Sequence, residues 1–355
     1  MRSLRWLCWL PLAVVSAEPV AGPLAENEWS ENELNDVLGQ NVSHASLCRE
    51  GGCWPATWIL GGQKCGTTSV WSWLTRNHNV CGAVVPPKKP AWFEKETHFW
   101  DSDWVSHVSH LAPADAARQF TALYPASKLK ECPNGFHEAT PANIRSAEAP
   151  RLLRAALPAP FRSELRFIAV LREPIARDLS AYNHQTQLGV SWCSACRNAT
   201  YATYETYARC RLETKTTKTS CMQGLDVGFY EAQLRRWATA FSRRQILVLE
   251  FGWLIANEAD AGRRIAAFLR FPALRAAATF PHSNAAVNIS RDNSKAPPHV
   301  TIRCHIRDRL EAVYEPENEK LYAYLAATRG PAEEPPFPRF ERMPCVGESR
   351  TNTHE

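Results

Sequence analysis

The chain of 355 residues carries little excess charge of either sign, with a formal net charge of +5. So small an excess gives no strong general affinity for nucleic acid, and nucleic acid is not an expected partner. The sequence has no internal repeat. Its hydrophobic share of 45% and its 13 tryptophans are ample for a sizeable core. One large α/β domain or two modest domains would fit this length.

The sequence also lacks a long apolar run at its N-terminus. Arg2 and Arg5 precede an apolar stretch of about a dozen residues, which is short for a membrane span. Ser16 and Ala17 follow it, as at a signal-peptide cleavage site. We predict a signal peptide over residues 1–17, with a short signal-anchor as the alternative. Membrane attachment is expected only if this segment is retained. Three Asn-x-Ser/Thr sequons agree with a lumenal protein: Asn41, Asn198 and Asn288.

A glycine-rich turn follows a short apolar segment at residues 58–60. It reads Gly61-Gly62-Gln63-Lys64-Cys65-Gly66-Thr67-Thr68. A strand, a loop and a helix N-terminus in this order attract anions through free N–H groups and the helix dipole. In the Walker pattern a Lys directly follows the second Gly, whereas Lys64 comes two residues before Gly66. We expect a phosphate-binding loop without an evident magnesium site. An ordinary turn between strand and helix is the alternative.

A second motif lies about a hundred residues later. Residues 167–171 are apolar and predict a buried strand, and Pro174 suits the first turn of a following helix. Four polar residues of this helix share one face by their spacing: Arg177, Ser180, His184 and Gln187. Arg172 and Ser180 could together bind a second phosphate. The alternative is a solvated basic helix face, which is the favoured interpretation for Arg177 taken alone.

Both motifs resemble sulfotransferases that use 3′-phosphoadenosine 5′-phosphosulfate (PAPS). The loop is similar to their 5′-phosphosulfate loop, and Leu171-Arg172-Glu173-Pro174 with Ser180 is similar to their 3′-phosphate site. The resemblance implies PAPS as co-substrate and no required metal. The implied cofactor contacts are Gln63, Lys64, Cys65, Gly66, Thr67, Thr68, Ser69, Arg172, Ser180 and Lys295.

The segment Glu96-Thr97-His98-Phe99-Trp100 resembles the Glu-x-His-Phe-Phe segment of heparan sulfate 3-O-sulfotransferases. The resemblance implies Glu96 as the catalytic base that deprotonates a hydroxyl. It implies that His98 contacts the substrate or assists proton movement. Lys64 would supply positive charge for the leaving phosphate. His184 is a further candidate, because its segment is similar to one in heparan N-sulfotransferases. The alternatives are a surface carboxylate at Glu96, paired with Lys95 or Lys89, and a structural role for His184.

The acceptor side of the resemblance is less uniform. Where the heparan 3-O enzymes have Lys in Glu-Lys-Thr-Pro, this chain has Ala139. That stretch, and the region from Cys221 to Leu249, are closer to N-acetylgalactosamine 4-sulfate 6-O-sulfotransferase. A basic cluster of Lys88 and Lys89 near Lys95 would suit an anionic polysaccharide, with a solvated loop rich in Lys and Pro as the alternative. We therefore predict O-sulfation of a glycosaminoglycan-like carbohydrate in the Golgi lumen. The rivals are a P-loop phosphotransferase and a non-catalytic polysaccharide-binding protein on the same fold.

The order of predicted elements defines the fold class. Strands are predicted at residues 58–60, 128–130, 167–171 and 246–250, and helices near 67–76, 174–187, 228–241 and 260–270. Their alternation predicts a P-loop-like three-layer α/β sandwich, with a central parallel sheet flanked by helices. Ahead of the domain at 51–330 we predict a stem-like segment at 18–50. A Cys-rich insertion is predicted at 188–225, and an irregular tail at 331–355.

In a lumenal compartment, the 12 cysteines are expected to form disulfides. Loss of Cys8 with the signal peptide leaves an odd number, and Cys65 is the candidate free thiol because a crosslink there would obstruct the ligand. Cys48 and Cys53 could close a local loop. Four cysteines of the insertion are expected to pair, with a zinc site as the alternative: Cys193, Cys196, Cys210 and Cys221.

Overall fold

The computed structural model describes residues 47–49, 52–101, 108–200, 202–217, 221–270, 280, 302–330 and 335–347. All of them belong to one compact unit, Asn41–Glu355. The predicted signal segment, nearly all of the predicted stem, the sequons at Asn41 and Asn288, and Lys295 lie outside the described residues. Within the described part of the chain, no helix is both long and apolar enough to cross a membrane.

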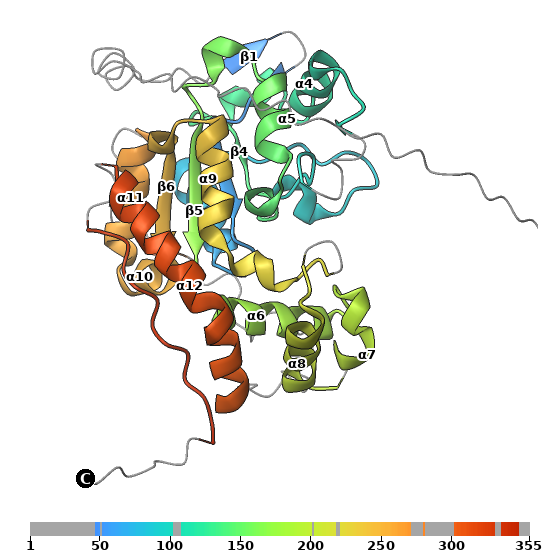
Figure 1. Ribbon diagram of the computed structural model, residues 1–355. Coiled ribbons are helices and arrows are strands. Elements are labelled where there is room, and N and C mark those ends of the chain that lie inside the picture. Colours follow the sequence, from blue (N-terminus) through green and yellow to red (C-terminus); the bar gives the residue numbers. More distant parts are fainter. Residues whose placement is uncertain are drawn as a thin grey trace, which may run out of the picture. The chain divides into compact units, whose positions relative to one another are not determined.

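Four parallel strands form the central sheet (Figure 1). They are β3 (Thr57–Gly61), β4 (His137–Glu138), β5 (Arg166–Leu171) and β6 (Ile246–Glu250), in the spatial order β4-β3-β5-β6. In the register, Trp58 is opposite Glu138 on one side and Phe167 on the other. The chain leaves β3 toward β4 and then crosses back to β5 on the opposite side. The carboxyl ends of β3 and β5 therefore flank the position where a parallel sheet binds ligands.

One predicted strand is wrong. Residues 128–130 lie in a 3₁₀ helix, η3 (Ala126–Lys130), whose Lys128 N–H donates to the carbonyl of Pro125 at 3.0 Å. None of the side chains of η3 is buried, whereas the inner strands of this sheet are buried on both faces. The fourth strand is instead β4, which is too short for a periodic pattern to reveal it.

Helices cover both faces of the sheet, which confirms the predicted three-layer sandwich. Side chains alternate between the faces of a strand. On one face Ile59, Ile168 and Leu247 pack with α2 (Thr67–His78), α10 (Phe251–Ala256) and α11 (Glu258–Leu269). On the other face Trp58 and Phe167 pack with α4 (Pro113–Thr121), α5 (Ala149–Ala156), α9 (Tyr230–Ala240) and α12 (Cys304–Thr328). These two apolar layers account for most of the core.

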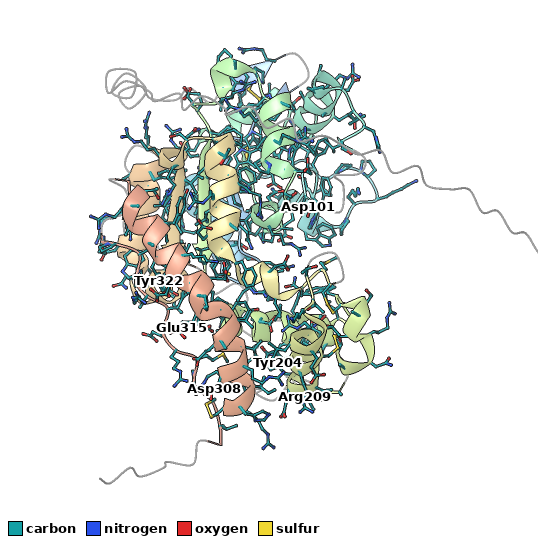
Figure 2. All side chains as sticks on the ribbon, viewed as in Figure 1. Asp101, Tyr204, Arg209, Asp308, Glu315 and Tyr322 are labelled. Carbon is teal, nitrogen blue, oxygen red and sulfur yellow. A yellow bond between two sulfur atoms is a disulfide. The ribbon has the colours of Figure 1, made fainter. Side chains whose placement is uncertain are left out.

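A third, smaller core lies under α6 (Pro174–Gln187), which follows β5. It includes α7 (Arg197–Thr200), α8 (Tyr204–Thr214) and the first turns of α12, which lie together in Figure 1. Beneath it, the carboxylate of Asp178 pairs with Arg211 and accepts from the Tyr204 hydroxyl at 2.8 Å; Tyr204 is labelled in Figure 2. The residues predicted as a Cys-rich insertion are therefore packed against the helix that carries Ser180 and His184.

Five disulfides are formed, in agreement with the expected oxidised cysteines: Cys48–Cys53, Cys81–Cys132, Cys193–Cys221, Cys196–Cys210 and Cys304–Cys345. The four cysteines of the insertion pair with one another, so the zinc alternative is wrong. Among the described cysteines, Cys65 is free and buried, as predicted. Asn198 is exposed on α7.

Short elements complete the fold. A hairpin of β1 (Cys48–Arg49) and β2 (Gly52–Cys53) precedes the sheet. The single-turn 3₁₀ helices are η2 (Ala91–Glu94), η4 (Asn143–Arg145), η5 (Ala159–Phe161), η6 (Ser194–Cys196), η7 (Leu225–Gly228) and η8 (Arg243–Gln245). Residues 335–347 form neither helix nor strand, and Phe337 and Phe340 pack on Tyr322 of α12.

Candidate active site

The glycine-rich loop connects the carboxyl end of β3 to the first turn of α2. Gly66 is the N-cap of α2 with φ 88°, and a Cβ there would lie 2.8 Å from the ring of Phe251. Both the left-handed backbone and this contact require glycine. The Gly62 N–H donates to Val170 O at 2.7 Å, which ties the loop to β5. The Ser69 N–H donates to Gly66 O at 3.0 Å, whereas the first two N–H groups of the helix, those of Thr67 and Thr68, precede any helical acceptor, so the loop has the form of an anion site.

Three cationic side chains gather at this loop. Burial, together with the positive charges of Lys95 and Arg172, lowers the pKa of Lys64 to about 8 against the opposing effect of Glu96. Arg172, at the carboxyl end of β5, donates from Nη1 to Lys64 O at 3.4 Å and lies 4.9 Å from the centre of the Phe251 ring. Cations held this close repel one another, and an anion between them relieves that repulsion. The residues present therefore fit a phosphate or sulfate group.

The remaining predicted cofactor residues differ in their surroundings. The Thr68 hydroxyl accepts from Lys95 Nζ at 3.0 Å, and Gln63 Oε1 accepts from the side chain of Gln223. Cys65 is fully buried, and burial raises the pKa of its thiol to about 11, so it is neutral. Ser180 is half-buried on α6 and has no hydrogen bond to Arg172 or to the loop within the described part of the chain. Its predicted role in the 3′-phosphate site stays a prediction.

The segment after η2 brings a carboxylate to the loop. Lys95 is buried, and its ammonium contacts both Thr68 and Glu96 Oε1. Burial by itself would raise the pKa of Glu96, but hydrogen bonds from His98 and Lys95 outweigh it and lower the pKa. Glu96 is therefore ionised. Its side chain is 23% exposed and pairs with Lys95, as the alternative interpretation of Glu96 expected. Lys95 also cannot join Lys88 and Lys89 in a surface basic cluster, since only those two are exposed.

His98 lies between two carboxylates. Its Nε2 is 3.5 Å from Glu96 Oε2, and its Nδ1 is 2.5 Å from Oδ2 of the buried Asp101, which is labelled in Figure 2. Burial would lower the pKa of His98, but Asp101 and Glu96 raise it to about 10. At neutral pH the ring is a cation that donates to both acids. It can orient Glu96 but has no free lone pair with which to act as a base.

His184, in contrast to His98, is uncharged at neutral pH. Burial, together with the charge of Lys64, lowers its pKa to about 4, and Glu96 partly opposes this shift. These two influences place His184 within electrostatic reach of the loop and of the carboxylate. The ring packs on Trp192, with centroids 5.5 Å apart, and its Nδ1 is buried without a hydrogen-bond partner. His184 is thus a neutral imidazole beside the site.

Sequence reasoning missed the carboxylate that holds this segment in place. Glu138, at the end of β4, accepts from Thr97 Oγ1 at 3.2 Å, Thr140 N at 3.1 Å and Asn143 Nδ2 at 2.7 Å. The Thr140 hydroxyl in turn accepts from His98 N at 3.1 Å. The next residue, Ala139, is fully buried in the core. That position, which is Lys in the heparan 3-O pattern, faces away from solvent in this protein.

The interpretation of Arg177 as part of a solvated helix face is wrong. The side chain is fully buried, its Nη1 donates to Gln223 Oε1 at 2.5 Å, and its Nη2 lies 3.3 Å from Asp178 Oδ1. Gln223 then donates from Nε2 to Gln63 of the loop. A polar chain therefore joins α6 to the anion loop through a residue of the disulfide-bonded insertion. Gln223 gave no signal in the sequence, because it is far in sequence from both of its partners.

Within the described residues, no group of three or more His, Cys, Asp or Glu side chains is arranged to hold a metal ion. The groups that converge at the carboxyl ends of β3 and β5 are instead an anion loop, its cations and an ionised carboxylate. This combination can bind a phosphate or sulfate ester next to a proton acceptor.

The chain is similar to the heparan sulfate N-deacetylase/N-sulfotransferases. It is 22% identical over 278 residues to the bifunctional enzyme of Drosophila melanogaster, which covers 75% of this chain and 25% of that protein. It is 23% identical over 278 residues to the human bifunctional enzyme 2, covering 74% of this chain and 28% of that protein. The chain thus spans about a quarter of the length of these relatives.

Among solved structures, a sulfotransferase from Alicyclobacillus acidocaldarius aligns with a TM-score of 0.49 at 20% identity. The alignment covers 78% of this chain and 100% of that one. Residues 55–291 match the family model described as sulfotransferase domain, a range that contains the anion loop, Glu96, His98, Arg172 and His184. The chain belongs to the sulfotransferase domain family.

Proposed function

We propose that this protein transfers a sulfuryl group from PAPS to a hydroxyl group of a carbohydrate, a glycosaminoglycan-like polysaccharide. One contact carries the proposal: the Lys95 ammonium touches both Thr68 of the anion loop and the carboxylate of Glu96. A donor held in the loop would therefore lie beside a group that can take the acceptor proton. Family membership of residues 55–291 supports the reaction class.

PAPS supplies the sulfuryl group, and this chain would bind it by its two phosphate groups. Lys64 and the first turn of α2 would hold the 5′-phosphosulfate, and Arg172 with Ser180 the 3′-phosphate. Lys295 is proposed to contact the same molecule. The lowered pKa of Lys64 supports this assignment. Burial and repulsion by two neighbouring cations lower the pKa, and a bound anion would offset that repulsion.

Glu96 would accept the hydroxyl proton. Each carboxylate oxygen has two lone pairs, so its contacts with Lys95 and His98 leave acceptor capacity for a substrate. These contacts also fix the orientation of the carboxylate, which is a requirement for general-base catalysis. His184, neutral and near both Lys64 and Glu96, is proposed to accept a hydrogen bond from the acceptor rather than to carry charge.

A carbohydrate acceptor is supported by an exposed aromatic ring. Trp92 has 57% of its surface exposed, and its ring meets His98 edge-on with centroids 5.7 Å apart. Sites for organic ligands combine such apolar faces with a few polar groups, and a sugar ring offers both kinds of surface. The curated relatives bear names that specify heparan sulfate. The five disulfides and the apolar segment at residues 1–17 support a location in the lumen of the secretory pathway, for which we propose the Golgi.

The test is to incubate the protein with radiolabelled PAPS and a panel of polysaccharides: unsulfated heparan backbone, chondroitin and chondroitin 4-sulfate. We expect label in at least one polymer, transferred at a rate lower by about a hundredfold or more in the Lys64→Ala variant. Label transferred from ATP instead of PAPS would favour the phosphotransferase. Polysaccharide binding that survives in Lys64→Ala, without transfer by either protein, would favour a non-catalytic role.

An amine acceptor is a second candidate, because the similar bifunctional enzymes are named N-sulfotransferases. The same carboxylate could take a proton from an ammonium or amine group. A de-N-acetylated heparan backbone, which presents free amines, belongs in the panel for this reason. Label in this polymer alone, absent after chemical re-acetylation of the amines, would assign N-sulfation and overturn the hydroxyl acceptor.

A further inference from the structure

Two histidine–tryptophan pairs flank the proposed base. In one pair the Trp92 ring meets His98 edge-on, with centroids 5.7 Å apart. In the other the Trp192 ring is tilted against His184, with centroids 5.5 Å apart. Both histidines lie near Glu96, since His98 Nε2 is 3.5 Å from its Oε2 and the charge of Glu96 acts on the imidazole of His184. Trp192 is therefore the counterpart of Trp92 at the site.

The order of the strands places the two pairs on opposite sides of the anion loop. The loop follows β3, which lies between β4 and β5 in the sheet. The segment of Trp92 and His98 is held on the β4 side, because His98 N donates to Thr140 Oγ1 just beyond β4 at 3.1 Å. His184 belongs to α6, which directly follows β5. An acceptor whose hydroxyl reaches Glu96 would therefore have one tryptophan on each side.

Hydrogen bonds connect the backbone of Trp192 to the anion loop. Its N–H donates to Oε1 of the buried Gln185 at 2.9 Å, and its carbonyl accepts from Met222 N at 2.8 Å. The next residue, Gln223, donates from Nε2 to Gln63 of the loop. Two hydrogen bonds and one step along the chain thus lead from Trp192 to the proposed cofactor site.

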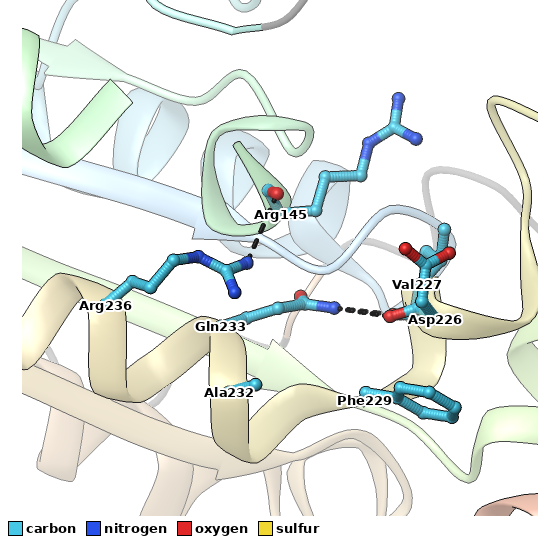
Figure 3. Close-up of a pocket in the computed structure, with 7 residues that line it drawn as sticks. All are labelled: Arg145, Asp226, Val227, Phe229, Ala232, Gln233 and Arg236. Carbon is cyan, nitrogen blue, oxygen red and sulfur yellow. Dashed lines mark hydrogen bonds between the residues drawn. The ribbon is translucent and has the colours of Figure 1, made fainter. Parts of the chain in front are cut away.

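The segment at residues 221–226, which holds Trp192, is itself anchored. Arg145 of η4 donates from Nη1 to the carbonyl of Met222. Arg236 of α9 in turn donates from Nη2 to Arg145 O at 3.3 Å, a bond that is drawn as a dashed line in Figure 3. Because these contacts already order the segment, binding of a ligand to Trp192 would cost little conformational entropy.

The surroundings of the two rings suit a sugar. Trp92 is 57% exposed and Trp192 is half-buried, and among the described residues neither ring is part of the three apolar cores. An apolar ring beside a few polar groups is the usual composition of a site for an organic ligand, and the C–H face of a sugar is apolar while its hydroxyls are polar. The face of an indole is electrostatically negative, so it does not attract a sulfate or phosphate ion.

We propose that Trp92 and Trp192 are acceptor-binding residues, which hold the apolar faces of the two sugars on either side of the modified one. The identity of the acceptor as a sugar chain rests on the proposed function. With one ring on each side of Glu96, the protein would select a chain of at least three sugars over a single sugar. The disulfide-bonded insertion would then contribute to acceptor specificity through Trp192.

The first experiment compares Trp92→Ala and Trp192→Ala with Trp253→Ala. Trp253 is the matched control, because it is also half-buried but packs on the core beside α2, with its ring 4.6 Å from the Arg264 guanidinium. Steady-state kinetics are measured with a disaccharide and a hexasaccharide of the accepted polymer. Thermal melts check that each variant is folded, and affinity for 3′-phosphoadenosine 5′-phosphate should equal that of the unmodified protein.

Both acceptor-site variants should raise KM for the hexasaccharide by about tenfold or more, as for a truncated aromatic anchor. The Trp192→Phe and Trp92→Phe variants should recover most of this loss. A disaccharide extends the modified sugar on one side only, so its KM should be sensitive to at most one of the two alanine variants. If Trp192 acted only by supporting His184, its loss would instead affect both acceptors equally.

Fluorine NMR of protein labelled with 5-fluorotryptophan gives a readout that does not depend on catalysis. The phenylalanine variants of Trp92, Trp192 and Trp253 assign the three signals. The probes are hexasaccharides of unsulfated chondroitin and of unsulfated heparan backbone, and sodium sulfate is the anion control. We expect a hexasaccharide, but not sulfate, to shift the signals of Trp92 and Trp192 while the Trp253 signal stays in place. These shifts would support the sugar-binding residues even if no polymer were sulfated.

Equal KM increases for both acceptor lengths, or increases no larger than that of Trp253→Ala, would overturn the proposal and leave sulfuryl transfer standing. A Trp192 signal that neither hexasaccharide moves, or that moves with sulfate, would overturn it as well.

Discussion

The imidazole of His98 lies 2.5 Å from the carboxylate of Asp101, measured from Nδ1 to Oδ2. Asp101 is fully buried, so its charge acts on the ring with little screening by water. The opposite edge of the same ring faces Glu96 at 3.5 Å. One buried acid thereby fixes both the charge of His98 and the direction in which it supports the proposed base.

Asp101→Asn is expected to lower the pKa of His98 from about 10 toward its ordinary value of 6.5, because the nearest negative charge is removed. In the unmodified protein the folded pKa is the raised one. The contribution of protonated His98 to the free energy of unfolding is therefore fully present below pH 6.5 and is lost as the pH rises through about 10. In the variant, this loss and any loss of turnover should begin nearer neutral pH. NMR titration of the imidazole protons measures the shift, and an unchanged midpoint would exclude Asp101 as its cause.

Lys64→Ala is expected to reduce kcat by about a hundredfold or more, as is typical when one electrostatic stabiliser of a transition state is removed. Cofactor affinity should fall less, since the charge matters most as the leaving phosphate develops. Turnover of the variant at the unmodified rate would remove Lys64 from the chemistry.

The same lysine predicts a pH dependence of cofactor binding. Lys64 has a pKa of about 8 in the protein without ligand, and a bound phosphate would favour its charged form. Affinity for 3′-phosphoadenosine 5′-phosphate should therefore be constant below about pH 8 and decrease above it, with proton uptake on binding. Calorimetry in two buffers of different ionisation enthalpy measures this uptake. The uptake should disappear in Lys64→Ala.

Arg172→Ala is expected to act on binding rather than on turnover, because the 3′-phosphate lies away from the reacting sulfur. Loss of one charge-assisted contact costs about 1.5–3 kcal/mol. The variant should bind adenosine 5′-phosphosulfate and PAPS with equal affinity, measured by thermal shift. A retained strong preference for PAPS would place the 3′-phosphate site elsewhere.

Glu96→Gln keeps the shape of the side chain but cannot accept a proton at neutral pH. Turnover should fall by about a hundred- to ten-thousandfold, the usual contribution of a general base. Cofactor affinity should stay close to that of the unmodified protein. Glu94→Gln is the control, since Glu94 ends η2 and its carbonyl oxygen accepts from Ala83 N. If Glu94→Gln alone is inactive, the assignment of the base is wrong; if both variants are active, His184 is the next group to test.

Gln223→Ala removes the shared partner of buried Arg177 and of Gln63 in the anion loop. Leaving a buried donor unpaired costs about 1–3 kcal/mol, so the melting temperature should fall. Cofactor affinity should fall as well, because the loop loses its tie to the insertion. Met222→Ala is the control, since that side chain is exposed. Equal melting temperatures and affinities for the two variants would show that the polar chain does not support the loop.

The sequence predictions that the structure confirms rest mostly on short, contiguous segments of the chain. The loop around Lys64 and Gly66 and the segment from Arg172 to Pro174 each lie within a few residues, so their structures depend on local backbone geometry. Strands β3, β5 and β6 are buried on both faces and appear as apolar runs. The order of these elements was sufficient to predict the parallel sheet and its two helical layers.

Tertiary structure decided what depends on partners that are distant in sequence. β4 has two residues and no pattern of its own, since pairing with β3 defines it. The guanidinium of Arg177 is buried beside Asp178, which balances its charge, and Gln223, which accepts from Nη1 and is brought there by the folded insertion. The charges of His98 and His184 differ because one ring lies between two acids while the other is buried near a lysine. A sequence lists ionisable groups, but their protonation depends on burial and on neighbouring charges, which exist only in the folded chain.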